Sequence, residues 1–233
     1  MYLQLKNYNN ANEILYVLKS IKDQVGQPIS KLGVQKLLYL AAALAPIKNI
    51  VLSLVKFITE KRGPYSSNIQ NVLDHLAAYG LIEISDFHIS KNKKSALAFY
   101  QITDGGINAV DSLVKYKREE EIFWWINIIT QLTILYTSEE QLKELTEFSG
   151  LDKIVKLVYQ DPTFKSTSKK QGRYAWIDLT KDDGLTYDLI KIAKEFLEGT
   201  KSKNFKDEKR KAEYILLSFF EFLYVKYLDE VNG

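Results

Sequence analysis

A chain of 233 residues with 46% hydrophobic content and a net charge of +3 is long enough for one large or two small domains with a substantial core. It contains no cysteine, which excludes disulfides, thiolate nucleophiles and cysteine-ligated zinc. The amino terminus lacks a signal-peptide pattern and no apolar run reaches the length of a membrane span, so we expect a cytoplasmic protein with no membrane partner.

Three helices are predicted at the start of the chain, each bounded by a capping residue or a helix breaker. Their apolar residues recur at helical spacing, so each helix has one face for the core. The predicted helices run from the cap at Asn9 or Asn10 to Gly26, from Lys31, after the cap Ser30, to Ala45, and from Ile47 to Lys61, before Gly63 and Pro64.

A fourth helix, capped by Ser66 or Ser67 and ended by Gly80, organises the first half of the chain. A strand begins at Leu81, and residues 98–102 are expected to pair with it in antiparallel fashion across a long polar loop with lysines at its tip. Helices followed by a capped helix and a two-stranded β wing predict a winged-helix domain over residues 1–114.

An all-helical second domain is predicted for residues 115–233, so the fold class is mainly α. The charged run 115–121 (KYKREEE) is the best boundary, unless it is a solvated stretch of one continuous helix. A turn at 103–106 and a short helix at 107–117 precede the boundary; beyond it, helices are expected at 121–136, 139–147, 151–159, 185–197 and 207–229, with an irregular loop at 161–173 and a short strand at 174–179.

Aromatic residues in the second half have two interpretations. We favour a central core helix for 121–136, which is apolar on two sides, and the sharper hypothesis makes part of it an interface with another chain. The last helix has an apolar face wide enough for several helices or a second protomer. The interface candidates are Phe123, Trp124, Trp125, Phe219 and Phe222. In the helix 185–197, by contrast, the apolar residues are expected to point inward; they are Leu185, Leu189, Ile192, Ala193 and Phe196.

The segment DPTFKSTSKKQG combines hydroxyl and cationic side chains. Such residues suit phosphate oxygens, so the segment is a candidate for a phosphate-contacting or partner-ordered loop. We favour a mobile surface loop, because its composition alone would produce the same pattern and it lacks P-loop glycine spacing. Its candidate residues are Lys165, Lys169, Lys170 and Arg173.

No catalytic or metal-binding pattern is found. His75 and His88 are the only histidines, and neither has neighbouring carboxylates at ligand spacing. Adjacent acidic residues occur, but consecutive helical residues do not face each other. We therefore expect a protein that is not an enzyme and has no cofactor.

Three segments resemble a known family: KLGVQKLLYL at 31–40, GPYSSNIQNVLDHLAAYGLIE from Gly63, and the later YQITDGG. They resemble the winged-helix module of YwgA-like and Panacea-type bacterial proteins, over residues 10–110. The pair Gly33-Val34 departs from the family's spacing, and nothing beyond Ser112 matches. The resemblance implies a prokaryotic protein associated with toxin control, mobile elements or anti-phage defence, without catalytic residues.

Two functions follow from these observations. In the preferred hypothesis, the winged helix is a scaffold and the aromatic second half binds a larger protein. The chain also resembles the small middle subunit of Lamassu or ABC-three-component defence systems, which implies an SMC-like or ABC ATPase, or an effector, as the partner.

The alternative is a stand-alone regulator or antitoxin-like protein that binds duplex DNA through the capped helix and the wing. Residues 66–84 contain no Lys or Arg but do contain Asp74 and Glu83, which disfavours this hypothesis. The DNA-contact candidates are Lys61, Arg62, Asn68, Gln70, Asn71, Lys91, Lys93 and Lys94.

Overall fold

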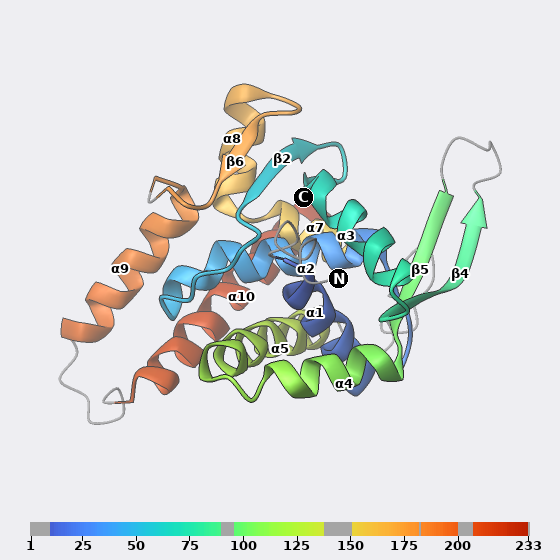
Figure 1. Ribbon diagram of the computed structural model, residues 1–233. Coiled ribbons are helices and arrows are strands. Elements are labelled where there is room, and N and C mark those ends of the chain that lie inside the picture. Colours follow the sequence, from blue (N-terminus) through green and yellow to red (C-terminus); the bar gives the residue numbers. More distant parts are fainter. Residues whose placement is uncertain (1–9, 90–95, 138–150, 182, 200–206, 233) are drawn as a thin grey trace.

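A computed structural model shows a mainly helical protein with two small antiparallel sheets (Figure 1). It describes residues 10–89, 96–137, 151–181, 183–199 and 207–232. The helices in these ranges are α1 (Ala11–Gln24), α2 (Lys31–Leu44), α3 (Ser67–Ala78), α4 (Asp104–Leu113), α5 (Lys117–Thr137), α7 (Leu151–Tyr159), α8 (Pro162–Gln171), α9 (Leu185–Gly199) and α10 (Glu208–Asn232). The strands are β1 (Ile29–Ser30), β2 (Lys56–Glu60), β3 (Gly63–Tyr65), β4 (Ile82–Ile89), β5 (Ala96–Ile102) and β6 (Trp176–Asp178).

The helix α2 lies at the centre of the core, and all of its residues from Gly33 to Leu44 are buried. Ser30 caps it as predicted, since Ser30 Oγ accepts a 3.1 Å hydrogen bond from the backbone N–H of Gly33. Helices α1, α5, α7 and α9 all contact α2. These helices come from both halves of the sequence, so the two halves share one continuous core. The boundary expected at residue 115 falls between α4 and α5, which both pack on that core.

The helix α5 is the core helix that the sequence predicts, although it begins earlier, at Lys117. Trp125 is fully buried, and its indole N–H donates a 2.8 Å hydrogen bond to the carbonyl of Ala41 in α2. Ile126 and Ile129 are buried beside it. The charged run is therefore divided: Lys115 and Tyr116 lie between α4 and α5, and residues 117–121 form the start of α5, so the run is not a stretch of one continuous helix.

The first sheet has the strand order β1-β5-β4 and confirms the predicted antiparallel pair. Ile82 lies opposite Ile102, and a register shift between Ile84 and Asp86 bends β4. The helix α3 ends just before Gly80, as predicted, because the φ of +69° at Gly80 is in the left-handed region that ends helices.

The second sheet has the order β3-β2-β6 and corrects one prediction. The helix expected over 47–61 is wrong, since residues 45–47 form only a short 3-10 turn and Lys56–Glu60 is the strand β2. In β2, Phe57 and Thr59 are buried and alternate with more exposed residues, which is the period of a strand. Gly63, with a φ of +89°, opens β3 after the turn. From residue 10 onward, the α-helices that precede α3 are therefore α1 and α2, not three.

The segment expected to be an irregular loop is largely the helix α8, so that prediction is also wrong. Asp161 caps the helix by accepting a 2.8 Å hydrogen bond from the N–H of Phe164, and Pro162 occupies the first helical position. Gly172 ends the helix with a φ of +78°.

The turn expected at 103–106 is the start of α4, with Thr103 as its cap. The expected helix at 139–147 lies outside the described residues. Among the described helices, none is both long and apolar enough to cross a membrane.

Candidate functional site

Two of the three segments that carry the family resemblance, 31–40 and the one from Gly63, contact each other directly. Gln35 in α2 exchanges two hydrogen bonds with the backbone of Ser66: its Nε2 donates to the Ser66 carbonyl at 2.8 Å, and its Oε1 accepts from the Ser66 N–H at 2.9 Å. The Nζ of the next residue, Lys36, donates to the carbonyl of Pro64 at 2.7 Å. The helix α2 therefore holds the segment that joins the β2–β3 turn to α3.

Lys36 is fully buried beneath this turn. Burial lowers the pKa of the Lys36 ammonium to about 7, and the nearby Glu60 carboxylate offsets only part of this effect. Gly63 lies directly above it: a Cβ at Gly63 would lie 3.0 Å from Lys36 Nζ and 2.9 Å from the ring of Tyr159. Glycine is favoured at position 63 for two reasons: a larger residue would collide with these two side chains, and the positive φ strains any residue that has a Cβ.

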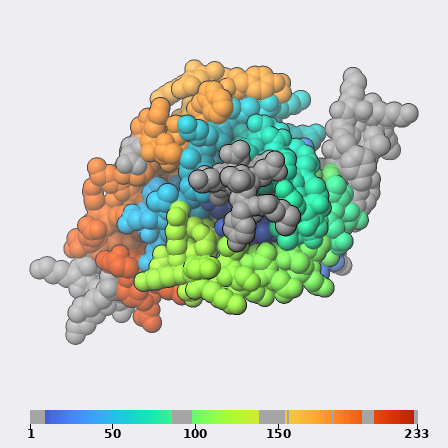
Figure 2. All heavy atoms as spheres, viewed as in Figure 1, coloured from blue at the N-terminus to red at the C-terminus, as the bar shows by residue number. Residues whose placement is uncertain are grey.

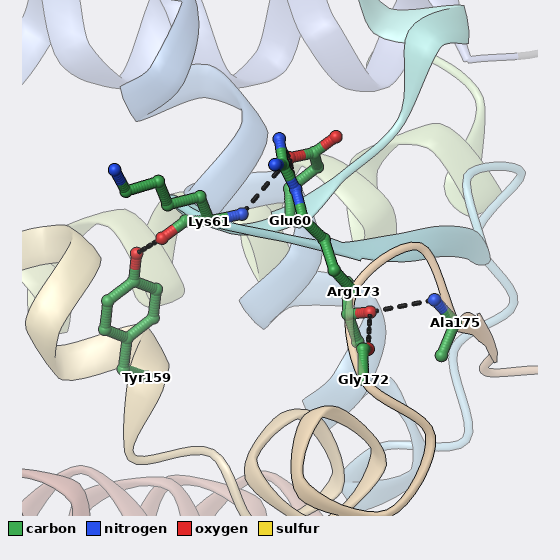
Figure 3. A network of polar contacts seen from close by, with 7 residues as sticks. Glu60, Lys61, Tyr159, Gly172, Arg173 and Ala175 are labelled. Carbon is green, nitrogen blue, oxygen red and sulfur yellow. Dashed lines mark hydrogen bonds and ion pairs between the residues drawn. The ribbon is translucent and has the colours of Figure 1, made fainter.

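Residues from the second half hold the turn from the other side (Figure 3). The hydroxyl of Tyr159 donates to the carbonyl of Lys61. Thr59 Oγ1 donates to the carbonyl of Gly172 at 2.7 Å and accepts from the N–H of Ala175 at 2.9 Å. The backbone of the turn is thus fixed between α2 and the α7–β6 region.

Two adjoining clefts, of about 480 and about 370 Å³, lie on either side of this turn. The linings of both clefts include Glu60, Lys61 and Arg173, and we call the two clefts together the hairpin groove. Its charged lining residues are the cations Lys31, Lys61, Arg62, Lys165, Lys169 and Arg173 and the carboxylates Glu60 and Glu230.

Two of the six cations are paired inside the groove. Arg173 donates from Nε and Nη2 to Glu60 Oε2, at 3.1 and 2.9 Å, and these bonds raise the pKa of the arginine. Lys165 pairs with Glu230, and this hydrogen bond lowers the pKa of the Glu230 carboxyl. Within the described residues, the other four cations, Lys31, Lys61, Arg62 and Lys169, have no ion-pair partner.

The groove brings together residues that the sequence placed in separate sets. Lys61 and Arg62 were DNA-contact candidates, whereas Lys165, Lys169 and Arg173 were candidates of the expected loop. Lys170 instead lines a different cleft of about 710 Å³, next to Trp176. Lys31 was missed, because it lies 30 positions before the turn that it faces.

The remaining DNA-contact candidates within the described residues all lie on α3. Asn68 and Asn71 are exposed on α3, but Gln70 is occupied by hydrogen bonds to Asp74 Oδ1 at 2.6 Å and to the Tyr100 hydroxyl at 3.4 Å. Lys91, Lys93 and Lys94 lie outside the described residues. The outer face of α3 therefore presents amides and Asp74 but no lysine or arginine.

The apolar stripe of α9 faces outward, which is opposite to its predicted orientation. Ile190 and Leu197, on the other side of the helix, are the residues that pack inward. Of the stripe residues, Ala193 is half-buried, and the others are exposed by 47% (Leu185), 40% (Leu189), 61% (Ile192) and 74% (Phe196). The hydrophobic periodicity correctly predicts that these residues share one face of the helix, but the core packs against the opposite face. In Figure 2, α9 (orange) forms part of the outer surface at one end of the molecule.

Of the five aromatic interface candidates, two are buried, two are partly buried and one is exposed. Trp125 and Phe219 belong to the core, so their assignment to an intermolecular interface is wrong. Phe123 and Trp124 are partly buried against that core, and Trp124 also lies 5.1 Å from the Lys209 ammonium. Phe222 is exposed by 37%, and α10 exposes Tyr214, Leu217 and Val225 near it in sequence.

No group of three or more potential metal ligands comes together in the part of the chain that the structure describes. A scan against models of known protein families gives no match, and a search of curated proteins finds no significant similarity.

Proposed function

We propose that this protein is a non-enzymatic accessory subunit of a bacterial multi-protein complex, in which its second half binds a larger partner. The exposed apolar stripe of α9 carries the proposal. Exposed apolar patches that are rimmed by polar residues mark interaction sites. Leu185, Leu189, Ile192 and Phe196 recur on successive turns, and the charged residues Asp188, Lys191 and Glu195 lie between them in sequence.

The arrangement of the first half supports a winged helix as the scaffold. The helices α1 and α2 precede α3, and the antiparallel pair β4–β5 follows it. Contacts of α1 with α3 and of α3 with β4 hold these elements together. The pair β4–β5 projects at the opposite end of the molecule from α9 (Figure 1), which leaves both ends accessible.

The surface chemistry of α3 favours this function over sequence-specific DNA binding. A helix that enters the major groove needs base-reading side chains and nearby cations to neutralise phosphates. The exposed residues of α3 include Asn71, Asp74 and His75 but no lysine or arginine. A protein partner can bind a face that has a carboxylate and no cation, whereas a nucleic acid would be repelled by Asp74.

The spacing of the α9 stripe fits an amphipathic helix of the partner, because residues three and four apart on one helix interlock with such a stripe on another. The resemblance to the middle subunit of Lamassu or ABC-three-component defence systems makes an SMC-like or ABC ATPase the expected partner. We expect a stoichiometric complex in which this chain contributes no catalytic group.

The test is affinity purification from the native host, with mass spectrometry of the partner. Wild type should recover a larger ATPase chain in equal amount, and Ile192→Glu with Phe196→Glu should lose it. Val51→Glu is the matched control, because Val51 is an equally exposed apolar residue (72%) outside α9. A wild-type monomer without any partner, or a double variant that retains the ATPase, would refute the proposal.

A further inference from the structure

We infer that the hairpin groove binds the phosphodiester backbone of a nucleic acid, independently of base sequence. The first argument is charge. Among the described residues that line the groove, six cations against two carboxylates give an excess of four positive charges, more than the +3 of the entire chain. The rest of the chain is therefore slightly acidic, and a depression lined with one sign of charge focuses the potential on a ligand of the opposite sign.

The second argument is the shape of the charged surface. The cations come from the start of α2 (Lys31), from the β2–β3 turn (Lys61 and Arg62), and from α8 and its end (Lys165, Lys169 and Arg173). They line two neighbouring clefts that share Glu60, Lys61 and Arg173, instead of surrounding one point. A chain of phosphates fits such a row better than a single anion does.

The third argument is preorganisation. The Lys36 ammonium donates to the Pro64 carbonyl, and the Thr59 hydroxyl donates to the Gly172 carbonyl. The Tyr159 hydroxyl donates to the Lys61 carbonyl (Figure 3). These bonds fix the backbone that carries Lys61, Arg62 and Arg173. Ligand binding then needs to order only the side chains, which lowers its entropic cost.

The fourth argument distinguishes a nucleic acid from an acidic peptide. Peptide sites are usually built around apolar anchoring pockets, but Phe164 is buried in this groove and Leu32 and Tyr65 are largely covered. The groove is also lined by Ser168, whose hydroxyl is of the kind that contacts phosphate oxygens together with Lys and Arg. Among the described residues that line the groove, no uncommitted Asn or Gln is present to read adenine, so we expect binding that does not depend on sequence.

The experiment is fluorescence anisotropy with labelled oligonucleotides of about 20 nucleotides, single-stranded and duplex, between about 50 and 200 mM salt. The groove variant is Lys61→Glu, Arg62→Glu and Lys169→Glu combined. The control is Lys115→Glu, Lys117→Glu and Lys191→Glu, which makes the same change in net charge at exposed positions outside the groove. Thermal melts followed by circular dichroism establish that both variants fold.

Wild type should bind with an affinity that falls steeply with salt, and the groove variant should bind at least about tenfold more weakly. Its log–log salt slope should be shallower by about 2 to 3, since each lost phosphate contact removes about 0.7 to 0.9. The control should stay within about threefold of wild type, because distant exposed charges are largely screened.

Three results would overturn the inference: no salt-dependent binding by wild type, an equal loss in the control variant, or competition by a glutamate polymer as strong as that by an oligonucleotide. The last result would identify the groove as a docking site for an acidic protein. The outcome is separable from the proposed function, because the groove variant should still recover the partner, and the Ile192→Glu and Phe196→Glu variant should still bind nucleic acid.

Discussion

The hydroxyl of Tyr39 donates a 2.6 Å hydrogen bond to Asp161, which lies 122 positions later in the chain. Both residues are fully buried, and burial raises the pKa of each. Asp161 also accepts from the Thr186 hydroxyl at 2.6 Å and caps α8. One carboxyl group therefore fixes the starts of α8 and α9 against the central helix α2.

Asp161→Ala should destabilise the protein by about 3–5 kcal/mol, because the Tyr39 hydroxyl, the Thr186 hydroxyl and the Phe164 N–H all lose their acceptor in the interior. Urea denaturation followed by circular dichroism measures this change. Asp183→Ala is the control: Asp183 is exposed, so the change should stay within about 0.5 kcal/mol. Equal effects of the two substitutions would contradict the role of Asp161.

Gly63→Ala should cost more than Gly26→Ala, although both glycines have positive φ. The strain of the backbone, roughly 1 kcal/mol, is common to both positions. At Gly63 the added methyl also meets Tyr159 and Lys36, whereas nothing lies within 4 Å at Gly26. We expect an additional loss of about 1–3 kcal/mol at Gly63 from overpacking. Similar melting temperatures for the two variants would contradict the packing of this turn.

The free energy of unfolding should rise with pH between about pH 7 and pH 9 because of Lys36. The folded protein releases the Lys36 proton near pH 7, whereas the unfolded chain keeps it until the ordinary value of 10.5. The unfolded state therefore binds more protons in this interval, and stability rises by up to about 1.4 kcal/mol per pH unit. Lys36→Met should flatten this slope in urea denaturation, while Lys61→Met, at an exposed lysine, should preserve it. Parallel profiles for wild type and Lys36→Met would refute the assignment.

The adjacent tryptophans of α5 should respond very differently to truncation. Trp125→Ala removes a fully buried side chain and the hydrogen bond to Ala41, so we expect a loss of about 3–5 kcal/mol. Trp124→Ala removes a partly buried ring and its contact with Lys209, for which about 1–2 kcal/mol is expected. Chemical denaturation compares the two, and a larger loss at Trp124 would contradict the assignment of Trp125 to the core.

Elements with strong local signals were predictable from the sequence. Ser30 and Gly80 mark helix ends by their own chemistry, and the apolar run of α2 predicted a buried helix. Where only distant partners decide the structure, prediction failed. The strand β2 pairs with the neighbouring strand β3 on one edge and with β6 on the other. The strand β6, Trp176–Asp178, lies far away in the sequence. The Asp161-Pro162 pair is typical of a helix start, but the polar composition of the residues after it is typical of a loop.

The hairpin groove could be predicted only in pieces. The position of Lys61 and Arg62 before α3 made them DNA-contact candidates. The polar and cationic composition of the segment 161–173 made Lys165, Lys169 and Arg173 candidates for phosphate contacts. Their meeting depends on contacts such as Tyr159 with Lys61 and Thr59 with Gly172, which join the two halves of the chain. No local pattern encodes those contacts.

The pairing of β2 with β6 also has a consequence for biosynthesis. Thr59 and Ala175, which are hydrogen-bonded at the junction of the two strands, lie 116 positions apart. At ribosomal rates of about 5–20 residues per second, the outer edge of β2 waits roughly 6–23 s for its neighbour to emerge. During that interval the nascent chain presents an unpaired strand edge, the kind of surface on which chaperones act and from which aggregation begins.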